Sequence, residues 1–298
     1  MEAGAAAAPQ ATTAKRTKTK TIKPDTAGTP WWMWIAVAAI VVFCLFPFYW
    51  LLNISFKTGA DLQSSRLLPP NPTFDNYEAI FKNPDFTKSL RNSAAVALLT
   101  TFFSIMVGAF CAYALARLRI AGKSIMLAIV LTISTFPQIA IAAPLFKLWS
   151  DIGLFNTWTG LIIPYLTFAL PLTIYILVSF FKEIPRDLEE AALVDGATHF
   201  QAFRKVVVPL AAPGLATAAI LTFIGAWNEF LLAVTLTSSS KARTVPAAIA
   251  FFTGATEHEV PFGSISAASV TISIPLIIMV LLFQKRIVAG LTAGAVKG

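Results

Sequence analysis

Six long apolar runs constrain this chain of 298 residues more than any other feature. They cover approximately residues 31–56, 90–116, 124–149, 158–181, 211–236 and 262–284. A hydrocarbon core about 30 Å thick needs roughly 20 apolar residues in a helix, and each run meets that demand. The runs are continuously apolar and do not alternate at every second residue, which favours helices over a β-barrel. The sequence therefore predicts an all-α integral membrane protein with six transmembrane helices.

Composition excludes several other classes of protein. Only 13% of the residues are charged, against about 25% in soluble domains. The net charge of +8 comes from basic residues that lie between the apolar runs, where they set orientation, so we expect no nucleic-acid partner. Cys44 and Cys111 lie inside apolar runs, and His199 and His258 lack ligand spacing. Neither a disulfide framework nor a metal site is predicted.

The distribution of basic residues predicts the orientation of the chain in the membrane. Fifteen of the 23 Lys and Arg residues fall on one side of the six runs and eight on the other. Both termini are therefore expected in the cytoplasm. Residues 1–30, rich in Ala, Thr, Lys and Pro, are expected to form a disordered cytoplasmic tail. Residues 31–284 would form the lipid-embedded domain, and 285–298 a second cytoplasmic tail that is disordered by composition.

A polar segment between the fourth and fifth runs then lies in the cytoplasm. Pro185 and Asp187 mark a helix start, because proline and acidic residues favour the first helical turn. Gly196 suits the left-handed residue that ends such a helix. Thr198 and Gln201 have the spacing of a capping box that starts a second helix. The segment is predicted to be a helix, a glycine turn and another helix, which by periodicity alone is most often an ordinary connection.

The spacing within this segment, residues 185–209, carries a resemblance to a known family. Glu190-Ala191-Ala192 is followed after three residues by Gly196, and after nine more by Val206, Val207, Val208 and Pro209. This resembles the signature of the membrane subunits of binding-protein-dependent ABC importers, with valines where Ile and Leu are usual. The resemblance implies a type I ABC importer permease fold, in which the segment is a coupling helix that docks on the ATP-hydrolysing subunit. The residues expected to couple are Glu190, Ala191, Ala192, Asp195, Gly196 and Pro209.

The resemblance extends to the maltose-type carbohydrate importers, and the C-terminal tail and the run Phe203–Asn228 are similar to trehalose-importing members. Asn76-Tyr77, Trp227–Phe230 and Val288–Gly298 also match that group. The implied partners are a second related permease, two ATP-binding subunits and an extracytoplasmic sugar-binding protein or lipoprotein. The chain has no GxxxxGK[ST] loop, so ATP and Mg²⁺ are expected to bind to the partner ATPase subunits. We expect no directly bound cofactor and no enzymatic activity in this subunit.

Two further groups of residues have alternative interpretations. Glu229, beside Trp227 and Asn228, is an acid within the fifth run, where charge is costly and points to a pathway or gate. The alternative is an interhelical hydrogen bond that only fixes packing. The last outer loop, residues 237–261, is either a flexible polar connector or, as the resemblance implies, a loop that reaches into the binding protein. The contacts would involve Thr253, Gly254 and Glu257.

Two rival functions remain open on the residues alone. An ion-coupled secondary transporter of small solutes needs ionisable groups inside the membrane, and Glu229 is essentially the only one. A membrane enzyme needs clustered acids or histidines at one membrane face, which are absent outside Glu189-Glu190. For the C-terminal tail, the resemblance implies insertion between the ATPase subunits. Five prolines within the runs predict bent helices: Pro137, Pro144, Pro164, Pro171 and Pro275.

Overall fold

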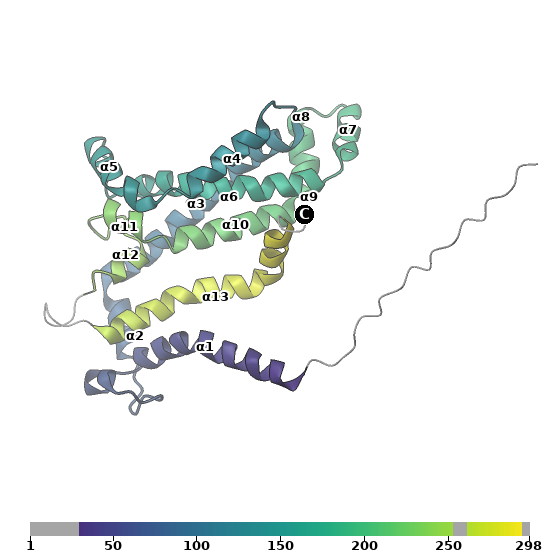
Figure 1. The fold of residues 1–298 in the computed structure, drawn as a ribbon. Coiled ribbons are helices and arrows are strands. Elements are labelled where there is room, and N and C mark those ends of the chain that lie inside the picture. Colours follow the sequence, from purple (N-terminus) through teal and green to yellow (C-terminus); the bar gives the residue numbers. More distant parts are fainter. Residues whose placement is uncertain (1–29, 253–260, 294–298) are drawn as a thin grey trace, which may run out of the picture. The chain divides into compact units, whose positions relative to one another are not determined.

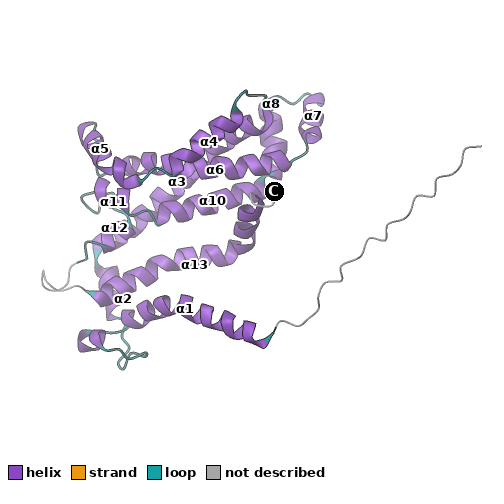
Figure 2. Ribbon diagram, viewed as in Figure 1, coloured by secondary structure: helices purple, strands orange, loops and turns teal. Residues whose placement is uncertain are grey.

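The computed structural model describes residues 30–252 and 261–293, and every regular element in these ranges is helical (Figures 1 and 2). The elements are α1 Trp31–Ser55, η1 Gly59–Gln63, α2 Asp75–Lys82, α3 Pro84–Arg117, α4 Lys123–Ser134, α5 Gln138–Asp151, α6 Trp158–Glu183, α7 Arg186–Val194, α8 His199–Ala202, a π-helical turn η2 Phe203–Val207, α9 Val208–Leu210, α10 Ala212–Trp227, α11 Leu231–Leu236, α12 Val245–Ile249 and α13 Phe262–Ala293. The predicted all-α class is confirmed.

Among the described residues, four helices are long and apolar enough to cross a membrane without a break: α1, α3, α6 and α13. Two further candidates are bent pairs. Helices α4 and α5 meet at 82°, and the helical stretch His199–Leu210 meets α10 at 76°. If each bent pair is counted as one span, the described residues contain up to six candidate spans, judged by length and composition alone. The run 124–149 is interrupted at Pro137, where a bend is predicted, and the run 211–236 is interrupted between α10 and α11.

Local sequence explains the break at Pro137 in the run 124–149. Pro137 caps the start of α5 with extended backbone, and a proline disfavours helix in the residue before it. Helix α10 ends at Trp227, and three residues separate it from α11. Pro144, Pro164 and Pro171 lie inside continuous helices, so no break occurs at these prolines.

Helices α3, α6 and α10 pack together through small and hydroxyl-bearing residues, within the compact unit formed by residues 47–298. A Cβ atom built on Gly108 of α3 would lie 2.7 Å from Thr173 Cγ2 of α6. The Thr173 hydroxyl is 2.9 Å from Ser104 Oγ and 2.9 Å from Thr222 Oγ1 of α10. Glycine at the crossing lets the backbones approach, and side-chain hydroxyls hydrogen-bond across it, as is typical of membrane helices.

The segment after α11 is held against the start of α3. Asn92 Nδ2 donates to the carbonyls of Ser240 (2.9 Å) and Arg243 (3.0 Å). Ser93 Oγ accepts from Val245 N at 2.8 Å, and the Val245 side chain is fully buried. Between Ser240 and Val245 the backbone of this loop is therefore held by buried polar groups of α3.

The composition of the C-terminal tail predicts disorder, but the structure shows a helix in its first part. Helix α13 continues to Ala293, so the expected disorder over 285–298 is wrong for residues up to 293. Alanine and leucine are strong helix formers, and single glycines do not end a helix that is already started.

A buried cluster follows α1. Lys57 is fully buried and its ammonium donates to the carbonyls of Ser64 (3.1 Å) and Arg66 (2.9 Å). Asn76 Nδ2 donates to Ser55 O (3.0 Å) and Lys57 O (2.8 Å). Asn76, which the sequence resemblance singled out, is therefore a structural residue that joins the end of α1 to α2.

Candidate functional site

The 185–209 segment has the predicted helix, turn and helix. Helix α7 ends at Val194, and Gly196 follows with a φ of +86°. Thr198 Oγ1 accepts from Gln201 N (3.2 Å), and Gln201 Oε1 accepts from Thr198 N (2.8 Å), which completes the capping box. A Cβ atom on Gly196 would meet nothing within 4 Å, so glycine is needed there for its backbone conformation and not for space.

Helix α7 has an inverted polarity. Its one buried residue is an acid, Glu189, which is 8% exposed. Two of its aliphatic residues lie outward instead, with Leu188 46% and Val194 87% exposed, whereas Leu193 is half-buried. Glu190 and Ala191 are exposed beside them. A buried acid beside exposed Leu188 and Val194 is the reverse of the pattern expected for a helix that faces only water.

The buried acid holds α7 to the end of α3. Glu189 Oε1 accepts a hydrogen bond from the Tyr113 hydroxyl, and Glu189 Oε2 lies 3.1 Å from Arg117 Nε. The other arm of the Arg117 guanidinium donates to Ile184 O at 3.0 Å. Tyr113 and Arg117 are four residues apart and therefore share one face of α3. One side chain of α3 thus binds both the end of α6 and the middle of α7.

Sequence reasoning missed this junction. The sequence singles out Glu189 only as one of the two adjacent acids Glu189-Glu190, and it singles out neither Tyr113 nor Arg117. A tyrosine and an arginine at helical spacing in the last turns of a span were the only available signal. Such a pair is weak evidence, because basic residues at span ends are expected from topology alone.

The second half of the segment is anchored in the helical core. The Phe203 ring in the π-helical turn packs on Tyr113 (ring centroids 4.8 Å apart) and Phe110 (5.3 Å) of α3. Val207 is fully buried. Pro209 lies exposed in the first turn of α9. The structure therefore gathers Glu190, Ala191, Asp195 and Gly196 on the exposed projection, whereas Pro209 lies on a separate helix.

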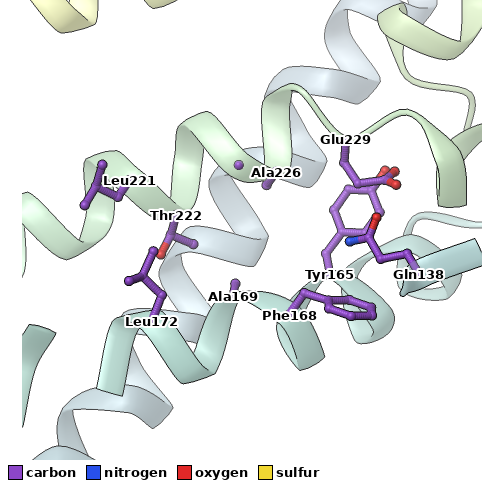
Figure 3. A pocket seen from close by; sticks show the side chains of 10 residues that line it. Gln138, Tyr165, Phe168, Ala169, Leu172, Leu221, Thr222, Ala226 and Glu229 are labelled. Atoms are coloured by element: carbon purple, nitrogen blue, oxygen red, sulfur yellow. The ribbon is translucent and has the colours of Figure 1, made fainter. Parts of the chain in front are cut away.

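A second candidate site is a cavity of about 170 Å³ between α5, α6 and α10. Figure 3 shows Gln138, Tyr165 and Glu229 gathered at one end. Towards the other end the lining becomes mostly apolar, with Leu172 and Leu221 around Thr222 (Figure 3). This wall combines an aromatic ring with hydrogen-bonding groups, the chemistry that suits a polyhydroxylated ligand.

Glu229 lies in the break between α10 and α11, not inside a helix of the fifth run as expected. Its carboxylate accepts from Leu232 N (2.7 Å) and Ala233 N (3.0 Å), so it caps α11. This geometry favours the structural interpretation of Glu229. A role in the pathway stays a prediction, supported by its place in the cavity lining.

Unlike Glu229, its neighbours Trp227 and Asn228 do not line the cavity. The Trp227 indole is buried, stacks on Phe223 (ring centroids 5.5 Å apart) and donates to Ile272 O of α13 at 3.2 Å. Asn228 is exposed and ends α10, its N–H bonded to Ile224 O at 3.1 Å. The loop residues Thr253, Gly254 and Glu257 lie outside the described residues.

Comparison with known proteins agrees with these features. The sequence profile of the family described as "Binding-protein-dependent transport system inner membrane component" matches residues 104–292. The trehalose transport system permease protein SugB of Mycobacterium tuberculosis is 53% identical over 266 residues, which cover 89% of this chain and 97% of SugB. The trehalose/maltose transport system permease protein MalG of Thermococcus litoralis is 42% identical, over 89% of this chain and 95% of MalG.

A solved structure supports the fold. A chain from the crystal structure of a bacterial ABC transporter involved in the import of the acidic polysaccharide alginate aligns with a TM-score of 0.73 and 26% identity. The alignment covers 85% of this chain and 94% of that chain, which confirms the predicted type I ABC importer permease fold. Since the family profile spans more than half of the sequence and its relatives match almost end to end, the chain belongs to the inner membrane components of binding-protein-dependent ABC transport systems.

Proposed function

We propose that this chain is the membrane subunit of an ATP-driven importer whose cargo is a disaccharide such as trehalose or a maltose-like sugar. The names of the relatives above support this class of cargo. The observation that carries the mechanism is the inverted polarity of α7, which presents Leu188 and Val194 outward. These exposed apolar side chains would be buried by a partner subunit. Nothing favours the ion-coupled alternative over this one.

In this proposal α7 docks on an ATP-binding subunit that also binds Mg²⁺. Two such subunits, a second related permease and an extracytoplasmic sugar-binding protein or lipoprotein complete the importer. The segment and both chain termini lie in the cytoplasm. Closure of the ATPase pair on ATP moves the coupling helices together, and the six spans convert that movement into opening of a pathway between the two permeases.

The membrane subunit supplies a path and not the hydrolytic chemistry. The cavity between α6 and α10 offers Gln138, Tyr165 and Glu229 as hydrogen-bonding groups beside the Phe168 ring. A sugar passing along this wall would exchange water for these groups without binding tightly, as a pathway requires. Among the described residues no cluster of three or more His, Cys, Asp or Glu side chains offers a metal site.

Substitution of Val194 by glutamate tests the docking face. Val194 is 87% exposed, so the change costs little in the isolated chain, but it places a charge in an interface that needs an apolar side chain. We expect Val194→Glu to lower co-purification of the ATPase and uptake of labelled trehalose at least tenfold in a strain that lacks the native chain. Leu68→Glu is the matched control, because Leu68 is 73% exposed and lies far from α7 in sequence.

Two outcomes would contradict the proposal separately. Unchanged ATPase association in Val194→Glu would remove α7 from the interface. Normal uptake of trehalose and maltose in the deletion strain, with loss of another solute, would keep the transporter class and reject the cargo.

A further inference from the structure

We infer that the buried contact of Glu189 with Arg117 and Tyr113 is the mechanical link that makes α7 move together with α3 and α6. This inference rests on the proposed function, because it assumes that α7 receives force from an ATPase subunit. Arg117 and Glu189 act here as positioning residues. They touch neither nucleotide nor cargo, but fix the angle at which α7 meets the helical core.

The covalent connection between α6 and α7 is weak by itself. Helix α6 ends at Glu183, and only Ile184 and Pro185 precede the start of α7. Both have extended backbone, with ψ angles of 125° and 134°, and Pro185 has no N–H to donate. Two extended residues form a hinge. A force applied to α7 alone would therefore rotate it about Ile184 before it displaced α6.

Arg117 contacts residues on both sides of this hinge. One of its nitrogens donates to Ile184 O (3.0 Å), a carbonyl at the end of α6 that no longer has a helical partner. Another lies 3.1 Å from the Glu189 carboxylate. The planar guanidinium is rigid, so its hydrogen bond to the hinge residue and its ion pair with the helix beyond, which lacks hydrogen-bond geometry at Nε, are fixed relative to each other.

Burial makes this contact specific. The Arg117 and Glu189 side chains are 7% and 10% exposed. A buried charge that loses its partner is strongly unfavourable, whereas exposed ion pairs on a surface contribute little. The neighbouring Glu190 is exposed on the same helix. Helix α7 therefore has a defined rotation, with one carboxylate turned to α3 and the other available to a partner.

Helix α3 carries the link across the domain. Its 34 residues span about 50 Å at 1.5 Å per residue. Near its end it holds α7, in its middle Ser104 joins the hydroxyl cluster with Thr173, and near its start Asn92 fixes the backbone at Ser240. A displacement of α7 that moves α3 as a rod reaches the segment that leads into the loop after α12.

The test measures transport and hydrolysis separately in the complete importer reconstituted with its partner subunits and binding protein. We expect Glu189→Gln and Arg117→Gln each to keep ATPase association and basal ATP hydrolysis. The amount of labelled trehalose transported per ATP should fall at least fivefold. The exposed Arg119, two residues beyond Arg117, gives the control Arg119→Gln, which should leave this ratio unchanged.

A pair of double variants shows whether the residues act together. Arg117→Gln with Glu189→Gln should be no worse than either single change, because the link is already broken. The exchange Arg117→Glu with Glu189→Arg should recover part of the lost ratio. If the single variants fail to assemble, Tyr113→Phe removes one hydroxyl and no charge, and should lower the same ratio by a smaller factor.

The inference is overturned if uptake falls only in proportion to the amount of assembled complex, or if the two single effects add in the double variant. It is also overturned if Tyr113→Phe assembles fully and couples normally. These outcomes presuppose a wild-type complex that moves sugar with ATP. A wild-type complex that does neither would instead contradict the proposed function.

Discussion

Glu189 and Glu190 are adjacent residues with opposite surroundings, and the difference shows what a sequence signature can and cannot predict. The fixed spacing through Glu190 identified the segment and, through the family resemblance, the class of partner that it implies. It gave no indication that the preceding acid is buried, because the partner Tyr113 lies 76 positions earlier in the chain. Which face of a short helix turns inward depends on such distant side chains. For the same reason, periodicity alone could not distinguish α7 from an ordinary connection.

At Glu229 the structure allows the two interpretations left open by the sequence to be separated. The carboxylate accepts two backbone N–H groups of α11. Glu229→Gln keeps one side-chain oxygen as acceptor, whereas Glu229→Ala removes both bonds and should cost about 1 kcal/mol of stability, as for other helix caps. We expect trehalose uptake near wild type in Glu229→Gln and a lowered thermal midpoint in Glu229→Ala.

The comparison of these two variants also tests the rival class of transporter. In an ion-coupled carrier, Glu229→Gln would abolish transport although the fold survives, because an amide cannot carry a proton. Loss of uptake in Glu229→Gln with an unchanged thermal midpoint would therefore contradict the capping role.

At the scale of the elements, long apolar runs predicted the position of the spans well and their continuity poorly. The break at Pro137 lies where a proline follows two residues of irregular backbone. Pro164 and Pro171, in contrast, are both buried within α6, where tertiary contacts keep the helix intact. A proline therefore marks a possible break, and packing decides whether the break occurs.

The crossing of α3 and α6 gives a prediction at this scale. In Gly108→Ala the new methyl group would lie 2.7 Å from Thr173 Cγ2, so the helices or the threonine must shift. Overpacking of this kind costs about 1–3 kcal/mol. Gly225→Ala in α10 is the matched control, since its Cβ would meet nothing within 4 Å. Thermal unfolding in detergent should show a lower midpoint for Gly108→Ala and an unchanged or higher one for Gly225→Ala.

Equal midpoints for the two glycine variants would show that the contact between α3 and α6 is loose. It would also weaken the description of α3 as a rod, because a rod transmits displacement only through close packing.

For the whole molecule, the excess of basic residues predicts that α7 and the segment after α1 lie on opposite sides of the membrane. Cys44 and Cys111 are free thiols and are first replaced by serine. In that background, Leu68→Cys should react with a membrane-impermeant maleimide in intact cells. Val194→Cys should react only in inside-out vesicles washed free of the ATPase. Both positions are well exposed in the chain, so accessibility is decided by the side of the membrane.

Labelling of both cysteines from the same side would reverse the assignment of α7 to the cytoplasm. It would contradict the proposed docking of α7 on the ATPase, whatever the sugar carried.

The outward side chains of α7 also bear on how the cell makes this protein. In the proposed orientation, a copy without its ATPase partner would display Val194 and Leu188 on the cytoplasmic side, where chaperones and proteases meet exposed apolar groups. The surface that serves transport in the complex would then identify surplus copies for removal. Synthesis of the subunits in matched amounts would be enforced by degradation, with α7 as the recognised element.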